Sequence, residues 1–163
     1  MPEPALPTTA ASQLLPPNPL AISRLAIDAR ARAATWQKEA ELAEVRLTIA
    51  DGKPRDLVFS FALPRGHFSP GIPLTGKHFE LAFDAERREF AEREVSTGPA
   101  LGAADPNCPL DAAYRAATQA GLSAQTLRTS YAYSAKHRRE LWTFQGAGKP
   151  LLVDGANCAI LVR

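Results

Sequence analysis

A chain of 163 residues, 45% of them hydrophobic, is long enough to bury the core of one domain or of two very small ones. Nineteen basic residues against seventeen acidic ones give a net charge of +2, far below the concentrated positive field that nucleic-acid binding usually requires. Charges interrupt the apolar runs well short of the roughly 20 residues that span a bilayer, so neither a nucleic-acid partner nor a membrane span is expected.

Residues 1–18 are predicted to form a disordered, proline-rich tail. Six of the fourteen prolines fall within residues 1–19, and proline lacks the backbone N–H that regular secondary structure requires. The tail also lacks a basic stretch followed by an uninterrupted apolar one, so it does not resemble a secretory signal. The sequence as given therefore predicts a cytoplasmic protein, or a periplasmic or secreted one if a signal peptide has been removed.

A helix followed by four strands is predicted over residues 19–96. Apolar and charged residues recur at helical spacing from Pro19 to about Glu44, and Asn18 resembles an N-cap that precedes a proline in the first helical position. Four segments then follow in which the pattern is that of strands, three of them with apolar residues at every second position. These segments are residues 45–49, 57–63, 79–83 and 89–95.

A second unit with the same order of elements is predicted over residues 108–163, after a linker at residues 97–107 that is rich in Gly, Ala and Pro. An apolar helical stripe begins at Leu110 and ends at Gly121. Four strand-like segments follow, at residues 127–133, 140–145, 151–154 and 158–162. The predicted fold is therefore α+β, with two αββββ units in which a helix packs on a four-stranded antiparallel meander, as in cystatin-like folds. Whether the two sheets join edge to edge is left open.

The connection at residues 64–77 is unusually long. It has fourteen residues, where about 4–6 are usual in compact domains. Its end, GIPLTGKH, differs by one residue from the phosphate-binding pattern G-x-x-x-x-G-K-[ST], because His78 replaces the hydroxyl residue. Pro73 removes one backbone donor and the following residues alternate as a strand rather than a helix, so the segment is interpreted as a structural turn. A second Gly-Lys pair, Gly148-Lys149, precedes a strand in the second unit.

The same connection is a candidate docking surface, because long loops on a rigid scaffold often carry binding groups. Its candidate contact residues are His67, Phe68, Ile72, Leu74 and Lys77. An insertion that only covers one end of the sheet explains the length equally well.

Residue types that perform chemistry form no catalytic pattern in the sequence. The histidines His67, His78 and His137 follow no metal-ligand spacing. Ser69 has no nucleophile elbow around it, and the glutamates lie in charged segments that solvent exposure explains. No catalytic residue, metal or cofactor is therefore predicted.

Cys108 and Cys158 lie fifty positions apart and outside any zinc-ligand pattern. They can be two free, part-buried thiols, because cysteine is a common packing residue. They can equally form a disulfide if the start of the second helix comes within about 7 Å of the last strand, measured between Cα atoms. A disulfide would imply an oxidising compartment, which conflicts with the absence of a signal in this N-terminus.

The second unit resembles a PepSY domain. The resemblance rests on the aromatic strand WTF at residues 142–144 and on the closing hairpin LVDGANCAIL at residues 152–161, which is similar to the family's terminal VDA-TG-xV signature. Ala156-Asn157 stand where Thr-Gly is typical, and FDA at residues 83–85 gives a looser match in the first unit. The resemblance implies a tandem pair of small non-catalytic bacterial modules that inhibit or regulate partners, often peptidases, outside the cytoplasm.

These observations predict a non-enzymatic binding or regulatory protein that contacts an unidentified protein partner through the loop at residues 64–77. The alternative is a small ligand-binding protein or enzyme that uses a cavity between helix and sheet. A deep pocket with histidines or clustered carboxylates would favour the alternative, and a shallow apolar patch around Phe68 and Ile72 would favour protein binding. A monomer or a weak dimer is expected, since exposed edge strands can pair.

Overall fold

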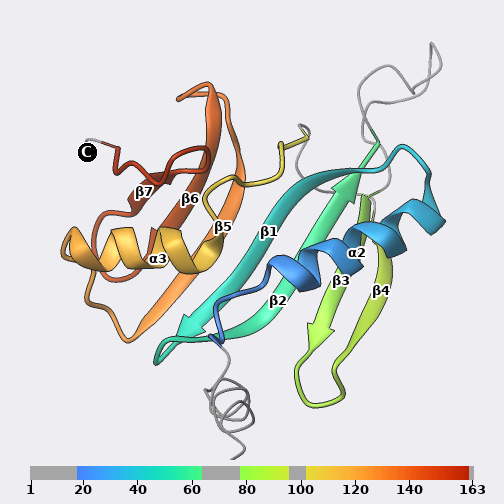
Figure 1. Cartoon of the computed structure of the whole chain (residues 1–163), viewed down its shortest axis with the longest axis horizontal. Coiled ribbons are helices and arrows are strands. Elements are labelled where there is room, and N and C mark those ends of the chain that lie inside the picture. Colours follow the sequence, from blue (N-terminus) through green and yellow to red (C-terminus); the bar gives the residue numbers. More distant parts are fainter. Residues whose placement is uncertain (1–17, 64–77, 96–101, 162–163) are drawn as a thin grey trace, which may run out of the picture.

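Seven strands form one antiparallel sheet in the computed structural model, which describes residues 18–63, 78–95 and 102–161. The strands are β1 (Glu41–Ala50), β2 (Lys53–Ala62), β3 (His78–Asp84), β4 (Glu89–Val95), β5 (Thr126–Ser134), β6 (Arg139–Gln145) and β7 (Leu151–Asp154). Their order across the sheet is β4-β3-β2-β1-β5-β6-β7, so β1 is central. Two helices, α2 (Ser23–Trp36) and α3 (Leu110–Gln119), lie on one face of this sheet (Figure 1).

The strands form where apolar residues alternate with polar ones. In β1, Val45, Leu47 and Ile49 are buried, and the residues between them are partly exposed. The turn from β1 to β2 is Asp51-Gly52, in which both residues have positive φ, of 52° and 75°. Two positive φ values are typical of the tight type I′ hairpin, for which Asp-Gly is a favoured sequence.

The first helix is shorter than the sequence predicts. It begins at Ser23, after the N-cap residue Ile22, and ends at Trp36 rather than near Glu44. Asn18 does not cap it, because its side-chain oxygen accepts a hydrogen bond from the Leu20 N–H in a turn that precedes the helix. Residues 41–44 favour a helix by propensity, but they pair with the end of β2, and this tertiary pairing outweighs the local preference.

The prediction of two αββββ units is wrong, because both halves of the chain share one sheet. β1 pairs antiparallel with β5 at seven positions, from Glu44 opposite Ala132 to Ala50 opposite Thr126. This pairing removes two sheet edges that separate units would expose to solvent. The protein is therefore α+β with a single antiparallel sheet of seven strands.

Among its described residues, the second half also has three strands instead of four. Residues that follow β7 return only as an isolated bridge between Val153 and Ile160. The cause is the tight turn after Asp154, whose side chain accepts hydrogen bonds from the Ala156 N–H at 2.7 Å and from Arg139 at 2.8 Å. Cys158 in this turn has a φ of 64°, which takes the chain out of the extended conformation.

A disulfide joins Cys108, at the start of α3, to Cys158, in the turn after β7. Their Cα atoms lie 5.3 Å apart, within the range that a disulfide spans. The Cys108 N–H donates to the Gly155 carbonyl at 2.8 Å, and the Trp142 indole donates to the Cys108 carbonyl at 2.8 Å. These bonds fix the beginning of α3 against β6 and the turn after β7.

One hydrophobic core lies between the sheet and the two helices. Trp36 of α2 stacks on Phe79 with ring centroids 5.2 Å apart, and Tyr131 packs against Trp142 at 4.9 Å. Tyr131 and Trp142 therefore belong to the core and not to an exposed aromatic surface. Neither α2 nor α3, the helices of the described residues, is long and apolar enough to cross a membrane.

Candidate functional site

The face of the sheet opposite the helices carries two rows of polar side chains. Residues that pair directly across antiparallel strands project on the same face. One row is Thr48, Arg128 and Gln145, and the next is Arg46, Ser130 and Thr143. These side chains are exposed or partly exposed, so this face is open to solvent along β1, β5 and β6.

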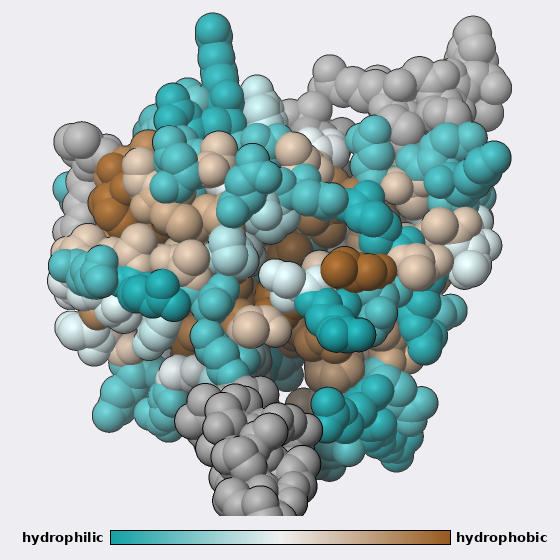
Figure 2. Space-filling view, viewed as in Figure 1, coloured by the Kyte–Doolittle hydropathy of each residue, from teal (hydrophilic) through white to brown (hydrophobic). Residues whose placement is uncertain are grey.

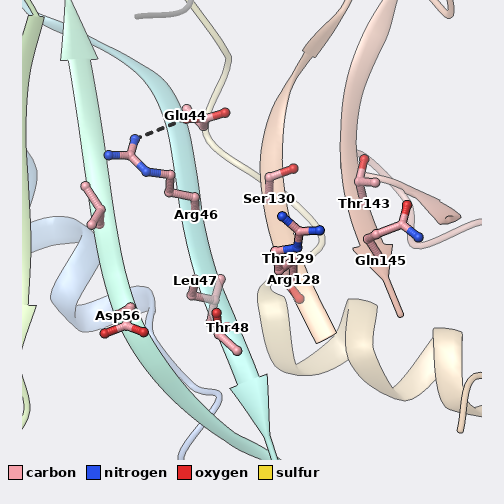
Figure 3. A pocket seen from close by; sticks show the side chains of 11 residues that line it. Glu44, Arg46, Leu47, Thr48, Asp56, Arg128, Thr129, Ser130, Thr143 and Gln145 are labelled. Carbon is pink, nitrogen blue, oxygen red and sulfur yellow. Dashed lines mark hydrogen bonds and ion pairs between the residues drawn. The ribbon is translucent and has the colours of Figure 1, made fainter. Parts of the chain in front are cut away.

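A shallow groove of about 500 Å³ follows these rows across the middle of the sheet (Figure 3). Its lining residues come from β1, β2, β5 and β6, and they are mostly charged or hydrogen-bonding. They are Glu44, Arg46, Leu47, Thr48, Asp56, Val58, Arg128, Thr129, Ser130, Thr143 and Gln145. The groove is a concave feature of the described residues on which a functional assignment can be based.

The face of the sheet that α2 and α3 cover has fewer features that indicate a binding site than the open face has. Figure 2 views that face and shows mostly polar side chains, with apolar ones between the two helices. Among the described residues, the large apolar side chains that are exposed are Ile27 on α2 and Ile160 after β7. Single exposed apolar residues of this kind are normal on a monomer surface.

Arg46 in the groove is neutralised by two carboxylates. Its guanidinium contacts Glu44 Oε1 at 3.2 Å and Glu80 Oε2 at 2.5 Å. Burial alone would lower the pKa of Arg46, but the hydrogen bonds and charges of Glu80 and Glu44 outweigh it and raise this pKa above its ordinary value. Arg46 is therefore a permanent cation that is already paired.

Glu80 on β3 is the buried centre of this cluster. It is only 7% exposed and also accepts a hydrogen bond from Arg93 on β4. Burial alone would raise the pKa of Glu80, but the bonds from Arg93 and Arg46 prevail and hold this pKa below its ordinary value. The cluster ties β1, β3 and β4 together on the open face.

Asp56 and Arg128 are the charges of the groove that stay unpaired. Both are exposed, and neither side chain has a hydrogen bond or ion pair with any residue in the described ranges. Figure 3 shows Asp56 on β2 and Arg128 on β5, with Thr48 of β1 between them. These two groups are free to pair with a ligand.

Asp56 is placed by a β-bulge. Arg46 pairs with Val58 whereas Thr48 pairs with Arg55, so two residues of β2 oppose the single residue Leu47 of β1. Asp56 takes a φ of 53°, a left-handed conformation that aspartate tolerates better than most residues. Bulges change the direction of a side chain, and they are frequent beside binding sites.

Two buried hydroxyls of the described residues, Ser60 Oγ and Thr129 Oγ1, have no hydrogen-bond partner. Ser60 pairs in register with Glu80, and Thr129 pairs with Leu47 on one side and Phe144 on the other. A buried hydroxyl without a partner costs stability. The two unpaired hydroxyls therefore lower the free energy of unfolding.

The docking residues predicted from the sequence, His67, Phe68, Ile72, Leu74 and Lys77, lie outside the described residues. His78 is buried at the start of β3, and His137 lies in the turn between β5 and β6. The groove residues were missed by sequence reasoning. Their only signal is their polar position in alternating strands, which does not reveal that Thr48 and Arg128 are neighbours.

The chemistry available to the groove is hydrogen bonding and ion pairing. It contains no histidine or cysteine, and none of its hydroxyl residues, Thr48, Thr129, Ser130 and Thr143, forms a hydrogen bond with its carboxylates Glu44 and Asp56. Across the described parts of the chain, no group of three or more His, Cys, Asp or Glu residues could hold a metal ion.

No family model, curated protein or solved structure matches this chain. The resemblance to PepSY domains accordingly stays a hypothesis based on the short motifs in the sequence. Function has to be argued from the groove itself.

Proposed function

We propose that this protein is a non-enzymatic binding protein that holds a protein partner on the open face of its sheet. The observation that carries the proposal is the groove of about 500 Å³, lined mostly by charged and hydrogen-bonding residues, that crosses four central strands on the face opposite α2 and α3. Strands fixed by pairing on both sides make a rigid platform, which lowers the entropic cost of binding.

A protein segment fits this groove better than a small molecule. Small-molecule sites enclose most of their ligand in a deep, largely apolar pocket. This groove is shallow and is lined mostly by residues with charged or hydrogen-bonding groups. Four strands at a spacing of about 4.8 Å give it a width of roughly 14 Å. An extended polypeptide could lie along it and use the hydroxyl and amide groups of Ser130, Thr143 and Gln145.

The alternative of a small enzyme or ligand carrier needs a cavity between helix and sheet. No specific observation favours it, because Trp142, Phe144 and Val153 pack beneath α3 as fully buried side chains. The loop at residues 64–77 joins β2 to β3, and it is proposed as a second contact with the same partner.

An oxidising compartment is part of the proposal. The bond between Cys108 and Cys158 supports it, since disulfides persist outside the reducing cytosol. A regulatory role of the PepSY type would require the same oxidising compartment. Such a role is also a form of protein binding, so it is consistent with the proposed function.

Site-specific photocrosslinking tests the proposal. A photoreactive phenylalanine analogue would replace Thr143 in the groove or, as the matched control, Thr118 on the exposed side of α3. We expect crosslinks to one partner protein from position 143 and not from position 118, and we expect Ser130→Tyr, which fills the groove, to abolish them. Crosslinking from position 118 alone, or no crosslink from position 143, would contradict the proposal.

A further inference from the structure

The charges of the groove define what its partner must carry. The charged lining residues are two acids, Glu44 and Asp56, and two bases, Arg46 and Arg128. Arg46 is held by Glu44 and Glu80, which leaves Asp56 and Arg128 as the two charges available to a ligand. A ligand that satisfies both must present one anionic and one cationic group.

The spacing of these two charges follows from the sheet. Asp56 is on β2 and Arg128 is on β5, and β1 lies between these strands. Two strand spacings of about 4.8 Å separate their backbones by roughly 10 Å. Thr48, which pairs with Arg128 in register, occupies the space between them.

We infer that the partner presents an extended segment with an acidic and a basic side chain two residues apart. This inference rests on the proposed function. Side chains two residues apart project on the same face of an extended chain and lie about 6.6 Å apart, and the flexible Glu, Lys and Arg side chains span the remaining distance to about 10 Å. The acidic side chain pairs with Arg128 and the basic one with Asp56, while Thr48, Ser130 and Gln145 hydrogen-bond to the segment between them.

Charge complementarity disfavours other occupants. The four lining charges sum to zero, and a nucleic-acid backbone would meet Glu44 and Asp56 as well as the two arginines. A lone anion would leave Asp56 unpaired beside it. A lipid surface would need an apolar or basic patch, whereas Val58 and Leu47 are the only apolar residues of this lining.

The test uses the isotope-labelled full chain and four short blocked peptides as probes in an NMR titration. The probe of interest is acetyl-Glu-Thr-Lys-amide, in which Glu and Lys share one face of the extended peptide. Its controls replace Glu by Gln, replace Lys by Gln, or place the Lys directly after the Glu. We expect saturable shifts of amides in β1, β5 and β6, with an affinity about two- to fivefold higher for the first peptide than for each control, as exposed ion pairs provide.

Two variants assign the charges. Arg128→Gln should remove the preference for Glu over Gln in the peptide and keep the preference for Lys. Asp56→Asn, which tolerates the same left-handed backbone, should do the reverse. Arg115→Gln on the exposed side of α3 serves as the control and should change neither. Equal affinities for the four peptides, or shifts confined to residues outside the groove, would overturn the inference.

The outcome of this test is separable from the outcome of the crosslinking test. If position 143 crosslinks a partner equally well in the wild type and in Arg128→Gln, and the peptides are not distinguished, the charge spacing is wrong while the groove remains the docking site. If position 143 crosslinks nothing, the docking site is wrong and the inference falls with it.

Discussion

Removal of the disulfide is expected to destabilise the protein strongly. The bond between Cys108 and Cys158 closes a loop with a sequence separation of 50. In the chain-entropy model, a loop of this length restricts the unfolded state by about 14 cal/mol/K, or about 4 kcal/mol at 25 °C. Domains of this size have a free energy of unfolding of about 5–15 kcal/mol, so the bond would supply a large share of it.

The double variant Cys108→Ala/Cys158→Ala measures this contribution by urea unfolding. With a slope of about 2 kcal/mol/M, the midpoint should fall by about 2 M. The urea midpoint of Cys158→Ala alone should fall nearly as far, because either substitution removes the disulfide. The reduced wild type should resemble the double variant. A loss below about 1 kcal/mol, or two alkylated thiols in the unreduced, unfolded protein, would refute the reasoning.

Three further predictions concern the open face and the buried hydroxyls. The pKa of Glu80 is lowered from its ordinary value of 4.5, so its ion pairs should stabilise the fold above about pH 4.5 and lose this effect as pH falls through the lowered pKa. Urea midpoints measured from pH 7 to pH 3 should therefore show a smaller acid-induced loss of stability in Glu80→Gln than in the wild type. Thr129→Val should raise the free energy of unfolding by about 1 kcal/mol, because it replaces a buried unpaired hydroxyl by a methyl group. A destabilised variant would show that the hydroxyl is paired. Asp56→Gly should be about 1 kcal/mol more stable than Asp56→Ala in thermal unfolding, since alanine is strained at a φ of 53°, and equal stabilities would argue against the left-handed conformation.

Local patterns in the sequence predicted most of the strands and missed how they assemble. Alternation of apolar residues placed strands at Leu57, Phe79 and Leu127, because burial of one face is a local property. The pairing of β1 with β5 joins residues about eighty positions apart and leaves no periodic signal in either strand. The prediction of a fourth strand in the second half was wrong, because Cys158 takes a positive φ in a turn that the disulfide and Asp154 stabilise.

The candidate site was harder to predict than the fold. The groove exists only because β1 and β5 bring Thr48 beside Arg128, and each of these residues alone resembles an ordinary solvated position. Asp56 is distinguished by a bulge that depends on the register between β1 and β2, which the sequence does not specify. The binding function that the sequence suggested stays a prediction.

The most direct test that the open face of the sheet binds the partner is chemical modification of arginine, with and without the partner protein that the crosslinking identifies. Phenylglyoxal labels exposed guanidinium groups, and mass spectrometry reports the extent at each residue. Arg128 in the groove and Arg115 on α3 are both exposed in the free protein. We expect the partner to protect Arg128 and to leave Arg115 reactive. Protection of Arg115 with full reactivity of Arg128 would contradict the claim that the open face of the sheet binds the partner.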